Sequence, residues 1–167
     1  MITRIYILDT LKMLDQKFKK STSQKESLFY SKLAILELCG WIEESMDDVV
    51  LRCARRHLKI RKNVNFLETE IVKRTSGFDY QNHFRRMLIQ LIGLINVEKI
   101  EKIVDQNKRL KLMATLSALK KIRDSEAHTH IKGITRNINA PSVTLNQFPA
   151  LYGGLVEFDA VMRRTKF

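Results

Sequence analysis

The chain of 167 residues carries 30 lysine and arginine residues against 18 aspartate and glutamate residues, which gives a formal net charge of +12. Hydrophobic residues make up 44% of the sequence, too large a share for a disordered tail, and the length suits a single domain, residues 1–167. Two cysteines exclude a disulfide-rich module and a four-thiolate zinc site. The positive charge indicates a polyanionic partner, nucleic acid first and an anionic membrane surface second.

Helix breakers are scarce in this sequence. Its two prolines are Pro141 and Pro149, so residues 1–140 contain no proline that would interrupt a helix. We therefore expect an all-α fold, an antiparallel helical bundle of four to six helices with one long connection before the last. We recognise no signal peptide and no run of about 18 apolar residues, and we expect a cytoplasmic protein without a membrane-spanning segment.

Six helical segments follow from the period of about 3.6 residues in the apolar positions. In chain order they cover about residues 2–20, 25–58, 66–74, 79–95, 97–126 and the stretch after Pro149, and the third is expected to be irregular. Asn96 is expected to separate the fourth segment from the fifth. Ser23 and Glu26 predict a capping box at the start of the second. Glycines inside predicted helices indicate places where neighbouring helices approach closely: Gly93, Gly153 and Gly154.

The second predicted helix carries its acidic and basic residues in separate parts. The acids form either a docking strip for a basic surface or a side that approaches the catalytic candidates below; they are Glu37, Glu43, Glu44, Asp47 and Asp48. The basic run fits either an RNA backbone track or a solvated helix end whose charges complement the helix dipole. The candidate RNA-binding residues are those of this run and two lysines of the fifth segment: Arg52, Arg55, Arg56, Lys59, Arg61, Lys62, Lys120 and Lys121.

The tryptophan and the two cysteines of this helix are expected to be structural. Trp41 is expected in the core or at an interface rather than as a platform for base stacking. Cys39 and Cys53 are separated by about 21 Å of helix, so they cannot form a disulfide with each other and are expected to be buried free thiols.

One segment near the end of the fifth helix combines residues suited to phosphate chemistry. Within eight positions it contains Arg123, Asp124, Glu126, His128 and His130. Arginine binds phosphate oxygens through a bidentate fork, and histidine can give or take a proton near neutral pH. In a continuous helix Arg123 and His128 lie about 140° apart, so they converge only if the helix ends near Ala127. His130 lies on the same face as Arg123 but about 10 Å further along the axis.

Spacing alone leaves two other interpretations of this segment open. Arg123 and the neighbouring acids can form an ordinary surface cluster, in which an arginine near the helix C-terminus complements the dipole. His128 and His130 can form half of a metal site, but the other histidines, His57 and His83, lie on other helices and no cysteine pair is near. We therefore expect no metal and no cofactor.

The run Arg123-Asp124-Ser125-Glu126-Ala127-His128 resembles the R-x4-6-H motif of the HEPN superfamily, in which a polar residue commonly follows the arginine. The helical layout and the position of the motif before the last helix also resemble that family. Two further stretches, residues 35–50 and 75–93, are similar to short bacterial HEPN proteins of the RiboL-PSP and MAE types. The likeness spans most of the chain.

The resemblance implies a metal-independent endoribonuclease, often the toxin of a toxin–antitoxin pair or a phage-defence effector, with two motifs facing each other across a homodimer interface. Carried over to this sequence, Arg123 and His128 are the core catalytic residues and Asp124 supports them. His130 satisfies the R-x6-H form and is the second choice of histidine. The implied partners are RNA (tRNA or mRNA), a second copy of the chain and a cognate antitoxin protein.

The sequence departs from one branch of the family. That branch carries R-x4-H-x-Y, whose tyrosine is adenylylated by a partner antitoxin, and here His130 stands at the tyrosine position, so a different control device is expected. Some HEPN domains lack activity. The alternative function is therefore a non-catalytic basic helical module that binds nucleic acid, a nucleotide or a partner protein.

Overall fold

A computed structural model describes residues 2–127, 131 and 138–167 of the chain. The regular elements among these residues are all helices, which confirms the expected all-α bundle. None of the described helices has an apolar stretch of the length and hydropathy needed to span a bilayer.

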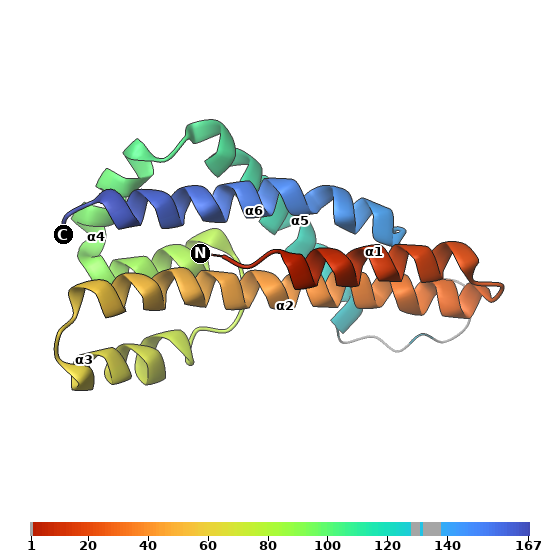
Figure 1. Cartoon of the computed structure of the whole chain (residues 1–167), viewed down its shortest axis with the longest axis horizontal. Helices are drawn as coiled ribbons and strands as arrows, with labels where there is room; N and C mark the ends of the chain where they lie inside the picture. The colour runs from red at the N-terminus through yellow and green to blue at the C-terminus, as the bar shows by residue number, and fades with distance from the viewer. Residues whose placement is uncertain (1, 128–130, 132–137) are drawn as a thin grey trace.

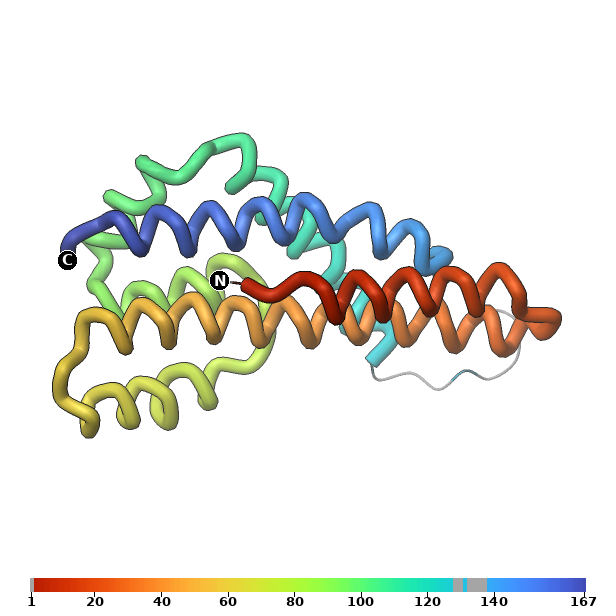
Figure 2. Tube along the Cα trace, viewed as in Figure 1, coloured from red at the N-terminus to blue at the C-terminus, as the bar shows by residue number. Residues whose placement is uncertain are grey.

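Four long helices form the bundle: α1 (Ile5–Lys20), α2 (Gln24–His57), α5 (Gln106–Ala127) and α6 (Pro141–Arg164). α2 packs against the other three, and α6 also packs against α1 and α5 (Figure 1). The remaining helices form a side branch that leaves the C-terminal end of α2 and leads into α5 (Figure 2). They are α3 (Arg61–Phe66), the π-helical turns η1 (Leu67–Val72) and η2 (Tyr80–Phe84), and α4 (Arg85–Ile103).

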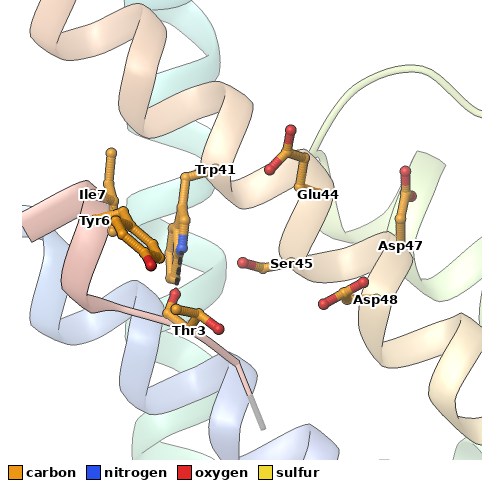
Figure 3. Close-up of a pocket in the computed structure, with 8 residues that line it drawn as sticks. All are labelled: Thr3, Tyr6, Ile7, Trp41, Glu44, Ser45, Asp47 and Asp48. Atoms are coloured by element: carbon orange, nitrogen blue, oxygen red, sulfur yellow. Dashed lines mark hydrogen bonds between the residues drawn. The ribbon is translucent and has the colours of Figure 1, made fainter. Parts of the chain in front are cut away.

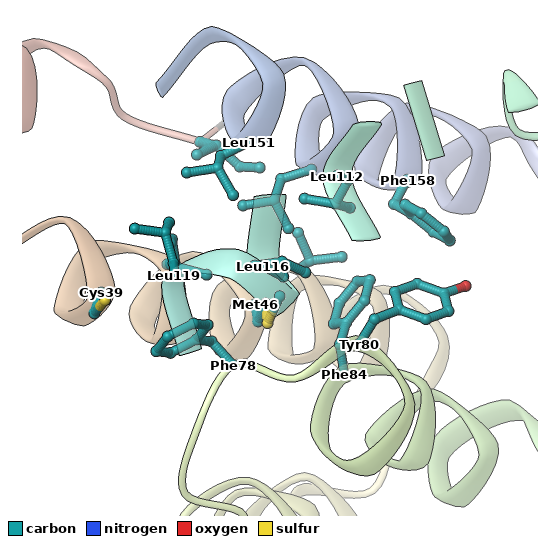
Figure 4. Packing of buried hydrophobic residues seen from close by; sticks show 14 of the residues in the cluster. Cys39, Met46, Phe78, Tyr80, Phe84, Leu112, Leu116, Leu119, Leu151 and Phe158 are labelled. Carbon is teal, nitrogen blue, oxygen red and sulfur yellow. The ribbon is translucent and has the colours of Figure 1, made fainter. Parts of the chain in front are cut away.

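The hydrophobic core lies between α2, α5 and α6 and extends to η2 (Figure 4). Its residues recur every three or four positions along each helix, as a helix that buries one face requires. On α2 they include Leu38, Ile42, Met46 and Val50, and on α5 they are Leu112, Leu116 and Leu119. Phe84 meets Phe158 of α6 edge to face with ring centroids 5.4 Å apart, which ties the side branch to the bundle.

The predicted break at Asn96 is wrong. α4 runs through this position, where Asn96 Nδ2 donates a hydrogen bond to the carbonyl of Ile92 at 2.8 Å. The interruption lies at Gly93, whose backbone (φ 78°, ψ 156°) is non-helical, and the chain reverses after Ile103. Only glycine adopts this positive φ without strain. The single helix predicted over 97–126 is two helices, because α4 ends at Ile103 and α5 begins at Gln106.

The last helix begins earlier than predicted. α6 starts at Pro141, which occupies the first turn, where a missing N–H leaves no hydrogen bond unmade. Pro149 lies inside the helix rather than before it. Proline has no N–H to bond the carbonyl four residues earlier. Pro149 lies on the exposed side of α6, where water can hydrate that carbonyl.

The start of α2 differs from the prediction. Ser23 is the N-cap residue, but its side chain makes no capping hydrogen bond. Instead, Ser21 Oγ lies 3.1 Å from Glu26 Oε2 and 2.9 Å from the Ser23 carbonyl. The predicted capping box is therefore absent, and a serine two residues earlier contacts the glutamate.

One of the three glycines predicted to mark close helix approach does so. A Cβ atom on Gly154 of α6 would lie 2.6 Å from Leu112 Cβ of α5, so the glycine lets these helices pack tightly. Gly93 and Gly153 would meet nothing within 4 Å, and for them the predicted close approach is wrong.

Gly154→Ala is expected to destabilise the protein by about 1–3 kcal/mol, because the added Cβ pushes α6 away from Leu112. The matched control is Gly153→Ala, where space is open and alanine favours the helix by about 1 kcal/mol over glycine. Urea unfolding measures both variants. Equal free energies of unfolding would contradict the close packing of α6 on α5.

Candidate active site

Arg123 continues the buried stripe of α5. Leu112, Leu116 and Leu119 are fully buried, and the next two positions at the same spacing hold Arg123 and Glu126. Glu126 is only 7% exposed, and Ser125 Oγ lies 3.5 Å from its Oε1. Polar side chains at core positions are uncommon, and where they occur they are paired or functional.

The Arg123 guanidinium is held by two carboxylates. Its Nη2 lies 3.5 Å from Glu43 Oε1 of α2, and its Nη1 donates a hydrogen bond to Asp124 Oδ1 at 3.2 Å. The Arg123 side chain remains 34% exposed, and that of Glu43 32%. A pair this exposed contributes less than about 1 kcal/mol to stability, so its main effect is to fix where the guanidinium points.

The acids of α2 are expected to form either a docking strip or a side that approaches the catalytic candidates. For Glu43 the contact with Arg123 favours the second. Glu43 approaches the motif and does not stand on a free surface. Asp124 accepts a hydrogen bond from Arg123, its neighbour in sequence. The sequence alone does not single out Glu43 from the five acids as the partner of Arg123. The two residues are 80 positions apart, and their contact depends on how α2 and α5 cross.

Cys39 lies one helical turn before Glu43 on α2. Burial raises the pKa of its thiol to about 12; the Arg123 charge opposes this shift, whereas Glu43 and Asp124 add to it. The thiol therefore stays protonated at neutral pH and serves as packing rather than as a nucleophile. Both cysteines are free and buried, as predicted.

Asp47 lies one turn after Glu43. Burial, and after it the nearby carboxylates of Glu43, Asp48 and Glu44, together raise the pKa of its carboxyl to about 7. The middle of α2 therefore concentrates negative charge beside Arg123 on an otherwise basic protein.

The two candidate histidines, His128 and His130, lie outside the described residues. The described part of α5 runs to Ala127, so the convergence of Arg123 and His128 stays a prediction. Beside this helix end is a pocket of about 280 Å³, whose lining includes Lys121, Glu126 and Asn139. Lys121 is exposed and Lys120 half-buried, both on the last turns of α5.

The basic run lies at the C-terminal end of α2, beyond the acidic middle that carries Glu43. Arg56 is 13 residues beyond Glu43, about 20 Å along the helix axis. The His57 ring meets the Phe167 ring at 5.1 Å, which brings the chain's basic C-terminus to the same place (Figure 1). We call the exposed cations of this region the basic end; they are Arg55, Arg56, Lys59, Arg61, Lys62, Arg164 and Lys166.

Arg52 has a different environment from the rest of the run. Its side chain is 23% exposed and lies 3.0 Å from Asp48 and 3.5 Å from the buried Asp159 of α6. Asp159 also contacts Arg163 at 3.3 Å. These ion pairs hold α2 to α6, and Arg52 therefore contributes to the bundle itself.

Trp41 lies partly in the core, as predicted. Its ring meets Phe148 with centroids 5.0 Å apart, and its Nε1 donates to the carbonyl of Thr3 at 2.9 Å. It also forms one wall of a pocket of about 440 Å³ between α1 and α2, in which Ser45 and Asp48 face the same space (Figure 3). This ring is already packed on one side and is not a free stacking platform.

Among the described residues, no group of three or more His, Cys, Asp and Glu side chains is arranged to hold a metal ion. Comparison of the chain with models of protein families, with curated proteins and with solved structures finds no match.

Asp47→Asn is expected to raise the free energy of unfolding at pH 8 and to change it little at pH 4. The pKa of Asp47 rises from the ordinary 3.8 to about 7 on folding, so the unfolded chain releases this proton first. Stability therefore falls as the pH rises from about 4 to about 7, and asparagine removes that loss. Urea unfolding at the two pH values measures the effect.

The control for this variant is Asp9→Asn, which removes the same charge from an exposed position of α1. A gain that is equal at pH 4 and pH 8, or equal in the two variants, would contradict the crowding of carboxylates around Asp47.

Proposed function

We propose that the protein is a metal-independent endoribonuclease of the HEPN type, the toxin of a toxin–antitoxin or phage-defence system. The observation that carries the proposal is the position of Arg123, a cation on the buried stripe of α5 that Glu43 and Asp124 hold at the helix end while a third of its side chain stays exposed. An arginine fixed in this way is suited to clamp a phosphate.

Cleavage begins when the 2′-hydroxyl of RNA attacks the adjacent phosphorus. A base takes the hydroxyl proton, and an acid gives a proton to the 5′-oxygen as its bond to phosphorus breaks. His128 fills these proton-transfer roles, with His130 as the second choice, and Arg123 stabilises the charge that builds up on the phosphate oxygens. The products are a 2′,3′-cyclic phosphate and a 5′-hydroxyl, and DNA is not a substrate because it lacks the 2′-hydroxyl.

One chain supplies one Arg123 and one His128, whereas the reaction needs a base, an acid and a clamp. A two-fold dimer brings two copies of each residue around one phosphate. The exposed part of Arg123 then faces the second copy, and Glu43 keeps each guanidinium from swinging back to solvent. Glu43 is in this account a positioning residue.

The basic end supplies electrostatic affinity for the RNA backbone. Arg56 lies about 20 Å beyond Glu43, the partner of Arg123, along the axis of α2, so an RNA strand that reaches both Arg123 and the basic end covers several nucleotides. The same cluster favours the second candidate function, a module that binds nucleic acid without cutting it. That module would hold RNA through the basic end and leave it intact.

Arg123→Ala and His128→Ala are each expected to lower the rate of RNA cleavage by roughly 100-fold or more, because each removes a group that acts only in the transition state. Incubation with total RNA and with tRNA in EDTA, followed by mapping of the ends, measures this. Lys17→Ala is the control, since it removes an exposed charge from α1 outside the proposed machinery. Unchanged cleavage in His128→Ala, or loss of wild-type cleavage in EDTA, contradicts the proposal.

Arg56→Ala/Arg61→Ala is expected to weaken RNA binding and to make it less sensitive to salt. Each lost phosphate contact lowers the slope of log affinity against log salt by about 0.7 for a single strand, so the slope falls by about 1.4. Fluorescence anisotropy with a labelled RNA measures it on the Arg123→Ala background. A slope equal to that of the matched variant Lys17→Ala/Lys20→Ala would show that the basic end does not bind RNA.

A further inference from the structure

The side branch contains a polar pocket of about 420 Å³ that the proposed cleavage site does not use. It lies between the end of η1 and the start of α4. The residues that matter for its chemistry are Arg74, Ser76, Asn82, His83, Arg86 and Gln90. Asn82, Arg86 and Gln90 recur every four residues, so they form one wall from a single side of η2 and α4.

Uncommon backbone features meet at this pocket. Both π-helical turns of the described chain, η1 and η2, contribute to its walls, and π-helical turns recur at functional sites. Between them Gly77 has a φ of 115° and lies directly against His83. A Cβ atom on Gly77 would be 2.7 Å from His83 Cε1, so only glycine allows the loop to lie on the imidazole.

The hydrogen bonds around Asp79 orient the imidazole. The backbone N–H of Asp79 donates to His83 Nδ1 at 3.0 Å, and Asp79 Oδ1 accepts from the backbone N–H of Asn82 at 2.7 Å. Because Nδ1 accepts, the ring proton lies on Nε2. His83 therefore offers the pocket a hydrogen-bond donor.

The charges that line the pocket are positive in sum. Arg74 pairs with Glu70 at 2.7 Å, and Glu70 is the acidic residue among those that line the pocket. Arg86 is exposed and makes no ion pair among the described residues. Together with Ser76, Arg86 and His83 give the pocket several hydrogen-bond donors and a net positive charge, a combination that suits an anion with several acceptor oxygens.

We propose that this pocket binds a phosphate group, carried either by a polynucleotide backbone or by a free nucleotide. The tetrahedral oxygens of a phosphate accept the fork of Arg86 together with the Nε2–H of His83 and the Ser76 hydroxyl. The proposal rests on this pocket and not on RNA cleavage.

The test uses the full chain with Arg123→Ala, which keeps added RNA intact. Inorganic phosphate, adenosine 5′-monophosphate and a ten-nucleotide RNA are titrated separately while the imidazole signals of His83 are followed by NMR. All ligands that bind are expected to shift the His83 signals, and adding Arg86→Ala is expected to weaken their binding by about tenfold. Adding Lys17→Ala, which removes one charge from α1, is expected to leave affinity within about twofold.

The three ligands separate the sources of the phosphate. Binding of the mononucleotide as tightly as of the RNA points to a free nucleotide, and binding of the RNA alone points to a polynucleotide; both support the pocket. The proposal is overturned if no ligand shifts the His83 signals, or if Arg86→Ala and Lys17→Ala weaken binding equally. Cleavage by the wild-type chain is measured separately, so failure of the pocket and failure of the proposed nuclease are distinguishable.

Discussion

α2 buries a single stripe of side chains against α1, α5 and α6 along most of its 34 residues, and the positions of the other helices follow from that contact. α5 meets this stripe with its own buried leucines and continues the same spacing past them. On α5 the next position is Arg123, and beside the α2 stripe stands Glu43. The packing of α5 on α2 therefore brings Arg123 and Glu43 together, and their ion pair fixes the direction of a guanidinium that would otherwise move freely in solvent.

The same packing separates the charges of the molecule. Carboxylates crowd the middle of α2, where burial raises the pKa of Asp47 to about 7, and exposed cations gather at the basic end. In the proposed nuclease the basic end attracts the RNA backbone, and Glu43 and Asp124 keep Arg123 oriented without neutralising the site entirely. Arg52 lies between these regions and joins α2 to α6 through Asp159.

The periodic features of the fold were predictable from the sequence, and its exceptions were not. Apolar spacing locates α1, α2 and the core face of α5, because burial of one face imposes that period. The kink at Gly93, the inclusion of Pro149 in α6 and the contact of Ser21 with Glu26 each depend on local geometry that other sequences with the same pattern do not share. Arg123 was identifiable from its motif, but its partner Glu43 required the crossing of two helices, and the π-helical turns have no periodic signature.

The central claim is that one active site is built from two chains, each contributing an oriented Arg123. Mixing wild-type protein with Arg123→Ala protein at constant total concentration, allowing subunits to exchange, and measuring RNA cleavage in EDTA tests this directly. If a site needs Arg123 from both chains, the rate falls with the square of the wild-type fraction, because mixed dimers are impaired. A rate that falls in direct proportion to the wild-type fraction, or an absence of cleavage by the wild-type protein, would contradict the account.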